Sequence, residues 1–343
     1  MRKIGISTKI ALVAAFVVFS IIISIGAGSV SVRPGDIVSI IGNKLFNLPL
    51  GGDIIDSTVS IVWDIRMPRV FSAFAVGAML SISGAVMQSL LQNPLASSYT
   101  LGVSSGASLG AAIIIVSEIS IPVLGLFLLP ITGFAFGLAT VLIVIFFSSR
   151  LDSNLRNHTI ILFGMVLSLF VNAILTMLSA YFSQHIQRLT LWTMGTFSGR
   201  KWIHVALLMG FFIVGMIAVL AFHRDMDLLN FGEEQALAMG VDTKKVKFIL
   251  LLLSSMLTGA SVCFTGIIGF IDLTVPHIAR KIFGSSHGML IPMSAFLGGG
   301  FMALADLLAR TVLAPREIPV GAITALVGAP FFLWVYLGGR KKV

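Results

Sequence analysis

Ionisable residues inside long apolar stretches are the first candidates for chemistry in this sequence. Asp306 and Arg310 lie four residues apart in LADLLAR, where an i, i+4 pair partly neutralises itself. Asp272, in GFIDLTVPHIAR, is followed by Arg280. A charged side chain at the centre of a bilayer costs roughly 3 kcal/mol on insertion scales, so each such residue is a functional candidate. A series of acidic residues across several spans would indicate proton transfer. The two isolated sites at Asp272 and Asp306 do not form such a series.

Nucleotide-binding and zinc-site signatures are missing from the sequence. It has no G-x-x-x-x-G-K-S/T loop for nucleotide phosphates and no H-E-x-x-H zinc motif. The six histidines are scattered, without the i, i+4 pairing of zinc ligands on one helix. The one cysteine, Cys263, can form neither an intramolecular disulfide nor a cysteine-based metal cluster. We therefore expect that this chain is not an enzyme and uses no cofactor or metal of its own.

The composition places the chain in a membrane. Apolar residues make up 57% of it and charged residues only 11%, whereas roughly a quarter of the residues in soluble domains are charged. We predict an all-α polytopic membrane protein with about ten transmembrane helices, forming one transmembrane domain over 1–343. The predicted spans lie near 7–28, 68–91, 96–117, 121–148, 158–183, 203–222, 246–266, 267–283, 288–309 and 319–338.

The distribution of charge predicts an orientation. Arg2 and Lys3 precede the first span, and Lys341 and Lys342 follow the last one. Because cytoplasmic segments carry an excess of Lys and Arg, we expect both termini in the cytoplasm of a multi-pass protein. The formal net charge of +9 does not form a basic stripe with interleaved aromatic residues, so no nucleic-acid partner is expected.

A proline break interrupts the apolar pattern in GAVMQSLLQNPLASSYTLGVSSGASLGAA, residues 84–112. Broken backbone at membrane depth is tolerated only where protein buries it or where it lines a water-filled cavity. A partial echo follows at 256–286, and in a ten-span topology the two copies run in opposite directions, which is the inverted repeat used by many transporters. The break is either part of a transport pathway or a tight turn between packed helices.

A polar segment at 223–247, HRDMDLLNFGEEQALAMGVDTKKVK, separates two predicted spans on the cytoplasmic side. Gly232 and Gly240 are placed to end two short helices, and Asp242 can cap the next span. Each short helix has an apolar side. Such a pair either lies flat on the membrane or fits a groove of another protein.

Four motifs together resemble one family. IRMPRVFSAFAVGAMLSISGAVMQSLLQNPLASSYTLGVSSGAS, LLNFGEEQALAMGV, GFIDLTVPHIAR and REIPVGAITALVGAPFFLWVYL follow one another from residue 65 to the C-terminus. They are similar to the FecCD or BtuC-like permeases, subunits of bacterial ABC importers for iron-siderophores, haem and cobalamin. The resemblance implies the type II importer permease fold in the bacterial cell membrane and a metal-chelate substrate. It implies as partners two ATP-binding subunits, a second permease subunit, identical or a paralogue, and an extracytoplasmic substrate-binding protein.

The resemblance also assigns roles to residues. It places 223–247 as the coupling segment for the ATP-binding subunit, with Gly232, Glu233, Glu234, Ala236 and Gly240 matching. The cytoplasmic gate would contain Asn93, Pro94 and Leu95 and, by position alone, Asn157, His158 and Thr159. Docking of the binding protein would use Arg66, Arg69 and Arg310, although the first two could instead anchor the chain at the membrane interface.

One residue departs from the family pattern, and two other function classes remain open. The family commonly has glycine where this chain has Asp272, and the sequence leaves open whether that carboxylate pairs with Arg280, pairs with another helix or touches the pathway. The expected function is translocation of an iron-siderophore or related chelate, driven by ATP hydrolysis on another chain. The alternatives are an ion- or proton-coupled secondary transporter, also built on inverted repeats, and a membrane enzyme.

Overall fold

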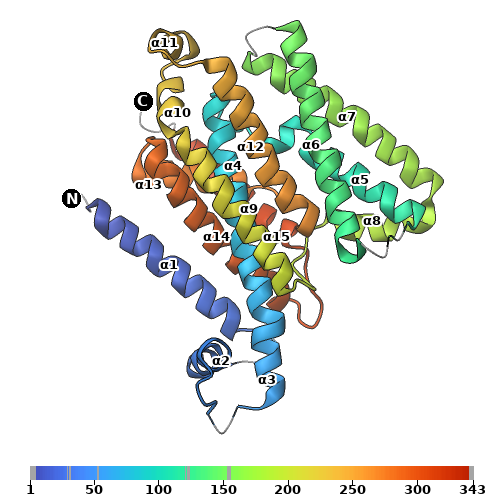
Figure 1. Ribbon diagram of the computed structural model, residues 1–343, viewed down its shortest axis with the longest axis vertical. Helices are drawn as coiled ribbons and strands as arrows, with labels where there is room; N and C mark the ends of the chain where they lie inside the picture. The colour runs from blue at the N-terminus through green and yellow to red at the C-terminus, as the bar shows by residue number, and fades with distance from the viewer. Residues whose placement is uncertain are drawn as a thin grey trace.

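The computed structural model describes residues 5–339 apart from 29, 31, 52–53, 120, 122–123 and 153–155. Within this part of the chain all regular structure is helical, which confirms the predicted all-α class (Figure 1). The predicted spans correspond to α1 (Ile6–Gly26), α4 (Met67–Leu90), α5 (Val103–Ser117), α6 (Leu128–Leu151), α7 (Asn157–Tyr181), α9 (Trp202–Ala221), α12 (Thr243–Thr265), α13 (Ile271–Phe283), α14 (His287–Thr311) and α15 (Val320–Gly339).

The spans differ in length. Among the described residues, seven helical stretches are long and apolar enough to cross a membrane. The remaining three predicted spans are α5, with 15 residues, α13, with 13, and α15, which has Pro330 inside it. About 20 residues are needed to cross the hydrocarbon core, so α5 and α13 each reach only part of the way.

Several helices lie outside the predicted spans. The span predicted at 68–91 begins earlier, because α3 (Asp56–Ser60) and a π-helical segment, η1 (Ile61–Arg66), run directly into α4. Pro68 has no N–H to donate to the carbonyl four residues before it, which is a physical reason for the wider turn that precedes it. Short helices α2 (Pro34–Phe46) and α8 (Ile186–Thr193) were not predicted.

Helix α4 occupies the centre of the bundle, where α14, α12, α9 and α13 pack around it. In the apolar 18-residue stretch of the continuous helix Asp56–Leu90, 94% is buried, whereas in the corresponding stretch of α7 only 17% is buried. Glycines allow this packing: a Cβ at Gly77 would overlap the backbone of Gly298 on α14, and a Cβ at Gly84 would overlap the carbonyl of Asp272 on α13. Small residues at these crossings bring the helix backbones into contact.

The two copies of the broken-helix pattern run in opposite directions. Ser254 Oγ of α12 lies 3.4 Å from Met87 Sδ of α4, and Ser83 Oγ lies 2.8 Å from Thr258 Oγ1. Residue numbers therefore fall along α4 as they rise along α12, so the two helices are antiparallel. Each is followed by a break and a short helix, α5 or α13. This arrangement matches the predicted inverted repeat.

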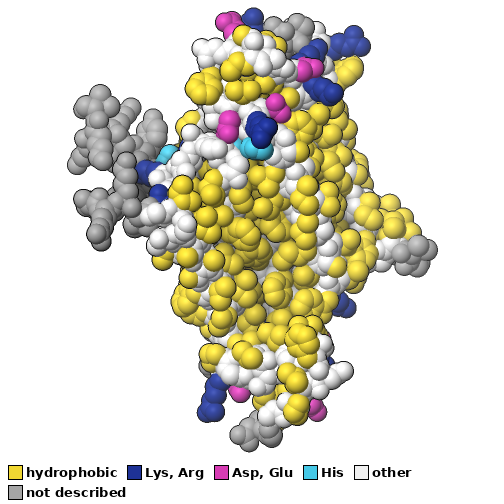
Figure 2. All heavy atoms as spheres, turned by 60° about the vertical axis from the view of Figure 1, so that its left-hand side comes forward, with side chains coloured by type: hydrophobic (Ala, Val, Ile, Leu, Met, Phe, Trp, Pro, Cys, Tyr) yellow, Lys and Arg dark blue, Asp and Glu magenta, His cyan; other side chains and the backbone are white. Residues whose placement is uncertain are grey.

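The two ends of the bundle carry different elements. Helices α10 (His223–Leu229) and α11 (Glu233–Ala238) cover one end, and α2 and α3 lie at the other (Figure 1). Lys9 Nζ donates to the carbonyl of Ile282 at 2.5 Å, which places the start of α1 beside the end of α13. Figure 2 shows hydrophobic side chains across the middle of one face and charged ones gathered toward its ends, as expected for a chain that crosses a bilayer.

The glycine at position 84 gives a test of this packing. We expect Gly84→Ala to destabilise the protein by about 3 kcal/mol or more, because the added methyl group meets backbone that cannot move without separating α4 from α13. The matched control is Gly210→Ala on α9, where nothing lies within 4 Å of the added methyl group. Thermal unfolding can be followed with a thiol-reactive dye, because Cys263 is buried. Equal melting temperatures for the two variants would show that the crossing tolerates a methyl group.

Candidate functional site

The break after α4 is a compact turn with its own hydrogen bonds. Gln92 has the left-handed φ of 48°. The side-chain Oδ1 of Asn93 accepts from the backbone N–H of Leu95 at 2.9 Å, and the carbonyl of Asn93 accepts from Ala96 at 3.0 Å. Pro94 is exposed, and Leu95 is 51% exposed. The predicted first gate segment therefore forms a self-supported loop whose tip is open to its surroundings.

Beyond this loop the chain turns back into the bundle and meets the second break, residues 266–270. The hydroxyl of Tyr99 donates to the carbonyl of Ile268 at 2.9 Å. The hydroxyl of Ser97 donates to the carboxylate of Asp272, whose other oxygen has no hydrogen-bond partner among the described residues. Ser97 is thus the observed partner of Asp272 at the start of α13.

Arg280, a candidate partner of Asp272, points elsewhere. Its Nη1 donates to Oε1 of Gln88 at 3.1 Å, and Gln88 Nε2 donates to the carbonyl of Leu273 at 3.2 Å. Gln88 thereby connects the last turns of α4 with both ends of α13. Of the alternatives that the sequence left open for Asp272, the structure shows a contact with Ser97, in the loop between α4 and α5.

Two short helices form in the predicted coupling segment, but α10 ends at Leu229 with Asn230 as its C-cap, and Gly232 is the N-cap of α11; Gly240 follows the end of α11 as predicted. Gly232 has a φ of 112° and Gly240 a φ of 89°, a region that favours glycine. Asp242 accepts a capping hydrogen bond from the N–H of Lys245 at 3.1 Å. Glu234 is exposed, whereas Ala236 is buried. The segment also has large apolar side chains on the protein surface: Phe231 is 67% exposed, Leu237 is 55% exposed and Met239 is 50% exposed.

Helix α10 is tied to the end of α4 by polar contacts. Asp227 Oδ1 accepts from the backbone N–H of His287 at 2.8 Å and lies 2.6 Å from its Nδ1. The other ring nitrogen of His287 lies 2.6 Å from Ser89 Oγ. Gln92, in the break itself, donates to the carbonyl of Leu229 at 3.0 Å. Helix α10 is therefore directly connected to the residue that precedes the first predicted gate segment.

The second predicted gate segment is the start of α7. Asn157 is its first residue, His158 is exposed and Thr159 is half-buried. The side-chain oxygen of Asn157 accepts from Lys247 Nζ at 3.0 Å, and the same ammonium forms an ion pair with Glu233 of α11. Lys247 was not among the predicted site residues.

The arginines predicted to dock a partner lie inside the chain. Arg66 is only 4% exposed, and its Nη1 donates to the carbonyls of Ile25 and Gly26 at 2.9 Å each. Arg310 donates to the carbonyl of Ser24. The last carbonyls of α1 have no partners within their own helix, and a cation at a helix C-terminus satisfies them. These two arginines therefore fasten the end of α1 to the bundle.

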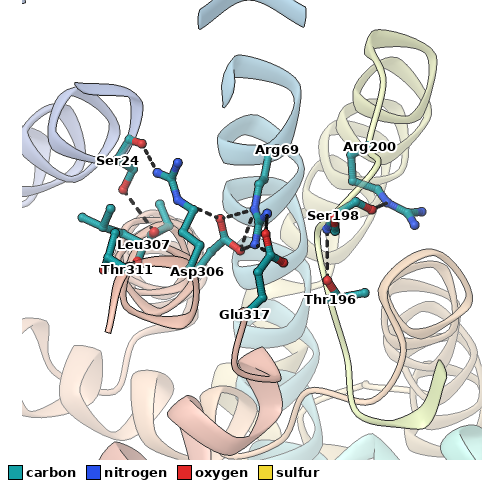
Figure 3. A network of polar contacts seen from close by, with 11 residues as sticks. Ser24, Arg69, Thr196, Ser198, Arg200, Asp306, Leu307, Thr311 and Glu317 are labelled. Carbon is teal, nitrogen blue, oxygen red and sulfur yellow. Dashed lines mark hydrogen bonds and ion pairs between the residues drawn. The ribbon is translucent and has the colours of Figure 1, made fainter. Parts of the chain in front are cut away.

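Arg69 is the centre of a buried charge network (Figure 3). Its Nη2 lies 2.9 Å from Asp306 Oδ1, and its Nη1 lies 2.6 Å from Glu317 Oε1. Arg310 Nε lies 3.8 Å from the other oxygen of Asp306. The Arg69 side chain is 8% exposed and that of Asp306 1%. The expected pair of Asp306 and Arg310 is thus part of a larger network that also includes Arg69 and Glu317, which lie outside α14.

Two further patterns bear on chemistry. Residues 102–106, GVSSG, fit the G-x-S-x-G pattern of serine hydrolases, but here they open α5, where a Cβ at Gly106 would overlap the side chain of Thr140 on α6. The glycine spacing therefore serves helix packing. In the described part of the chain no three His, Cys, Asp or Glu side chains are placed to hold a metal ion.

The charge network gives a second test. We expect Arg69→Met to lower the free energy of unfolding by about 3–5 kcal/mol, because it leaves the carboxylate of Asp306 buried without its main partner. Arg316→Met, at an exposed arginine beside Glu317, is the control. Adding Asp306→Leu to Arg69→Met should recover part of the loss, since the buried charge is then gone. If thermal unfolding of Arg69→Met matches that of the control, the network does not stabilise the fold.

Comparison with known proteins agrees with this architecture. Residues 16–338 match the FecCD transport family. The chain is 39% identical over 331 residues to the uncharacterized ABC transporter permease protein YvrB of Bacillus subtilis, covering 95% of this chain and 94% of that protein. It is 38% identical over 285 residues to the hemin transport system permease protein HmuU of Yersinia pestis, with 82% and 84% covered.

A solved structure has the same fold. It is described as an inward-facing conformation of a metal-chelate type ABC transporter, and it aligns with a TM-score of 0.83 and 28% identity over 96% of this chain and 99% of that one. The helix breaks, the short half-helices and the family match thus agree, and this chain belongs to the FecCD transport family and has the type II fold of ABC importer permeases.

Proposed function

We propose that this chain is the membrane-spanning subunit of an ATP-driven importer that carries a metal chelate into the cytoplasm. The observation that carries the proposal is that polar contacts link the helix pair α10–α11 to the chain at both predicted gate segments. Gln92, directly before the first segment, contacts Leu229, and Asn157 of the second shares Lys247 with Glu233. Movement of the helix pair by a partner would therefore act on the loops that close the path.

The proposed partner at α10–α11 is an ATP-binding subunit, present in two copies in the complex. The exposed side chains of Phe231, Leu237 and Met239 support this assignment, because apolar groups that protrude from a polar cytoplasmic segment fit a groove of another protein. A second permease subunit and an extracytoplasmic binding protein complete the proposed assembly, with both termini of this chain in the cytoplasm.

The substrate class rests on the relatives. Two of them are named as hemin and cobalamin permeases, and another as an Fe(3+) dicitrate permease. We infer a chelate of this kind, with an iron-siderophore as the leading candidate. A docking role for Arg66, Arg69 and Arg310 stays a prediction, and their internal contacts favour a structural role over docking.

Uptake into vesicles tests the proposed function against its alternative, a proton-coupled transporter. The chain should be purified with its ATP-binding subunit and reconstituted with the binding protein. We expect iron-siderophore, haem or cobalamin uptake that requires ATP and persists when a protonophore removes the proton gradient. The chain alone should bind no ATP, since it has no P-loop. Uptake that needs no ATP and stops with the protonophore would establish the alternative.

The partner surface gives a separate prediction. We expect Phe231→Ser to weaken the association with the ATP-binding subunit by at least about 2 kcal/mol, as for an aromatic anchor at an interface. The control is Phe46→Ser, which changes a phenylalanine of similar exposure, 73% against 67%, on α2 at the opposite end of the bundle. Co-purification and titration in detergent measure the association. Equal affinities for both variants would remove Phe231 from the proposed interface.

A further inference from the structure

The Lys247 side chain is buried in a part of the protein where most lysines are exposed. It lies in the second turn of α12 and is 1% exposed, whereas Lys244 and Lys245 on the same helix are exposed. Among the described residues it is the one lysine in the buried set. Burying a charge is costly unless the charge is paired and hydrogen-bonded. The contacts of this ammonium are therefore a fixed part of the structure.

Those contacts join two helices that do not follow each other in the sequence. The ammonium donates to Asn157 Oδ1 at 3.0 Å and forms an ion pair with Glu233. Glu233 is the first residue of α11 and Asn157 is the first residue of α7. One side chain on α12 thus connects the start of the proposed coupling helix with the start of the proposed second gate segment.

Apolar packing does not fill the space between these two starts. A surface cleft of about 360 Å³ lies there, lined by Arg156, Glu233, Glu234, Leu237, Asp242, Thr243 and Lys244. An open cleft leaves the two segments free to shift relative to each other at the surface. The buried ammonium, which contacts both, restricts that shift.

We propose that Lys247 is the positioning residue that transmits movement of α11 to the gate segment 157–159. Helix α10 contacts the chain just before the other gate segment by separate side chains, through Gln92 and through Asp227, His287 and Ser89. The inference rests on the proposed function, because it takes α11 as a coupling helix. Its consequence is that the two gate segments respond to the ATP-binding subunit through different side chains and can be disconnected one at a time.

Cysteine labelling in different nucleotide states tests whether the two gate segments respond through different side chains. The full complex carries Cys263→Ala and one new cysteine, His158→Cys or Leu95→Cys, both at exposed positions. A membrane-impermeant maleimide is supplied to the cytoplasmic face without nucleotide and with trapped ATP. We expect Lys247→Met to abolish the nucleotide dependence of labelling at position 158 and to preserve it at position 95. Lys245→Met, the control on the same helix, should preserve both.

Further variants keep the test decisive. If Lys247→Met fails to assemble, Asn157→Ala removes only the acceptor on the gate side, and the same loss at position 158 is expected. Exchanging the charges, with Lys247→Glu and Glu233→Lys together, should restore the response, because the amide of Asn157 can turn to donate to a carboxylate. A normal response at position 158 in Asn157→Ala or Lys247→Met would overturn the inference and leave the proposed function intact. Labelling that is independent of nucleotide at both positions in the otherwise unsubstituted complex would refute the gate assignment and this inference with it, while a failure of ATP-dependent uptake into vesicles would refute the proposed function itself.

Discussion

A peptide group inside a bilayer must find a hydrogen-bond partner within the protein, and the arrangement of this chain follows from that requirement. Two helices end at breaks within the chain, and polar side chains on either side of the first break contact the second break and the start of α13. Tyr99 binds the carbonyl of Ile268, Ser97 binds Asp272, and Gln88 binds the carbonyl of Leu273. Such contacts require the helix backbones to approach closely, which explains why glycine stands at position 84. The breaks, the short half-helices and the small residues around them are consequences of one constraint.

Buried charges obey the same requirement. The guanidinium of Arg66 meets the last carbonyls of α1, so two groups that would each be costly to bury satisfy one another. Arg69 lies between the carboxylates of Asp306 and Glu317. Removing Arg69 leaves the carboxylate of Asp306 buried without its main partner, whereas the Glu317 side chain is 41% exposed and reaches water. The docking role that the family resemblance implies for Arg66, Arg69 and Arg310 stays a prediction, and each of the three has contacts inside the chain.

The sequence was sufficient for features that depend on composition or on local turn chemistry. Apolar runs located the spans, and the conformational freedom of Gly232 and Gly240 marked the two turns on either side of α11. Helices α2 and α8 were missed because they are short and lie outside the long apolar runs. The burial of Lys247 could have been inferred, since it shares a helical stripe with buried residues at positions 243, 246, 250 and 251. Its partners could not, because they come from helices 90 and 14 residues away and depend on the packing of the whole bundle.

The helix pair α10–α11 has exposed apolar side chains on one side and polar contacts with the bundle on the other. Its outward side carries Phe231, Leu237 and Met239, and apolar contacts of this kind tolerate small adjustments at an interface. Its inward side holds the bundle through Asp227 and Glu233, whose charge-assisted hydrogen bonds are short, directional and costly to break away from water. In the proposed function, a displacement imposed on the apolar side would therefore be passed to the rest of the chain by the polar side. We infer that the polar contacts, more than the apolar ones, select which helix follows the pair.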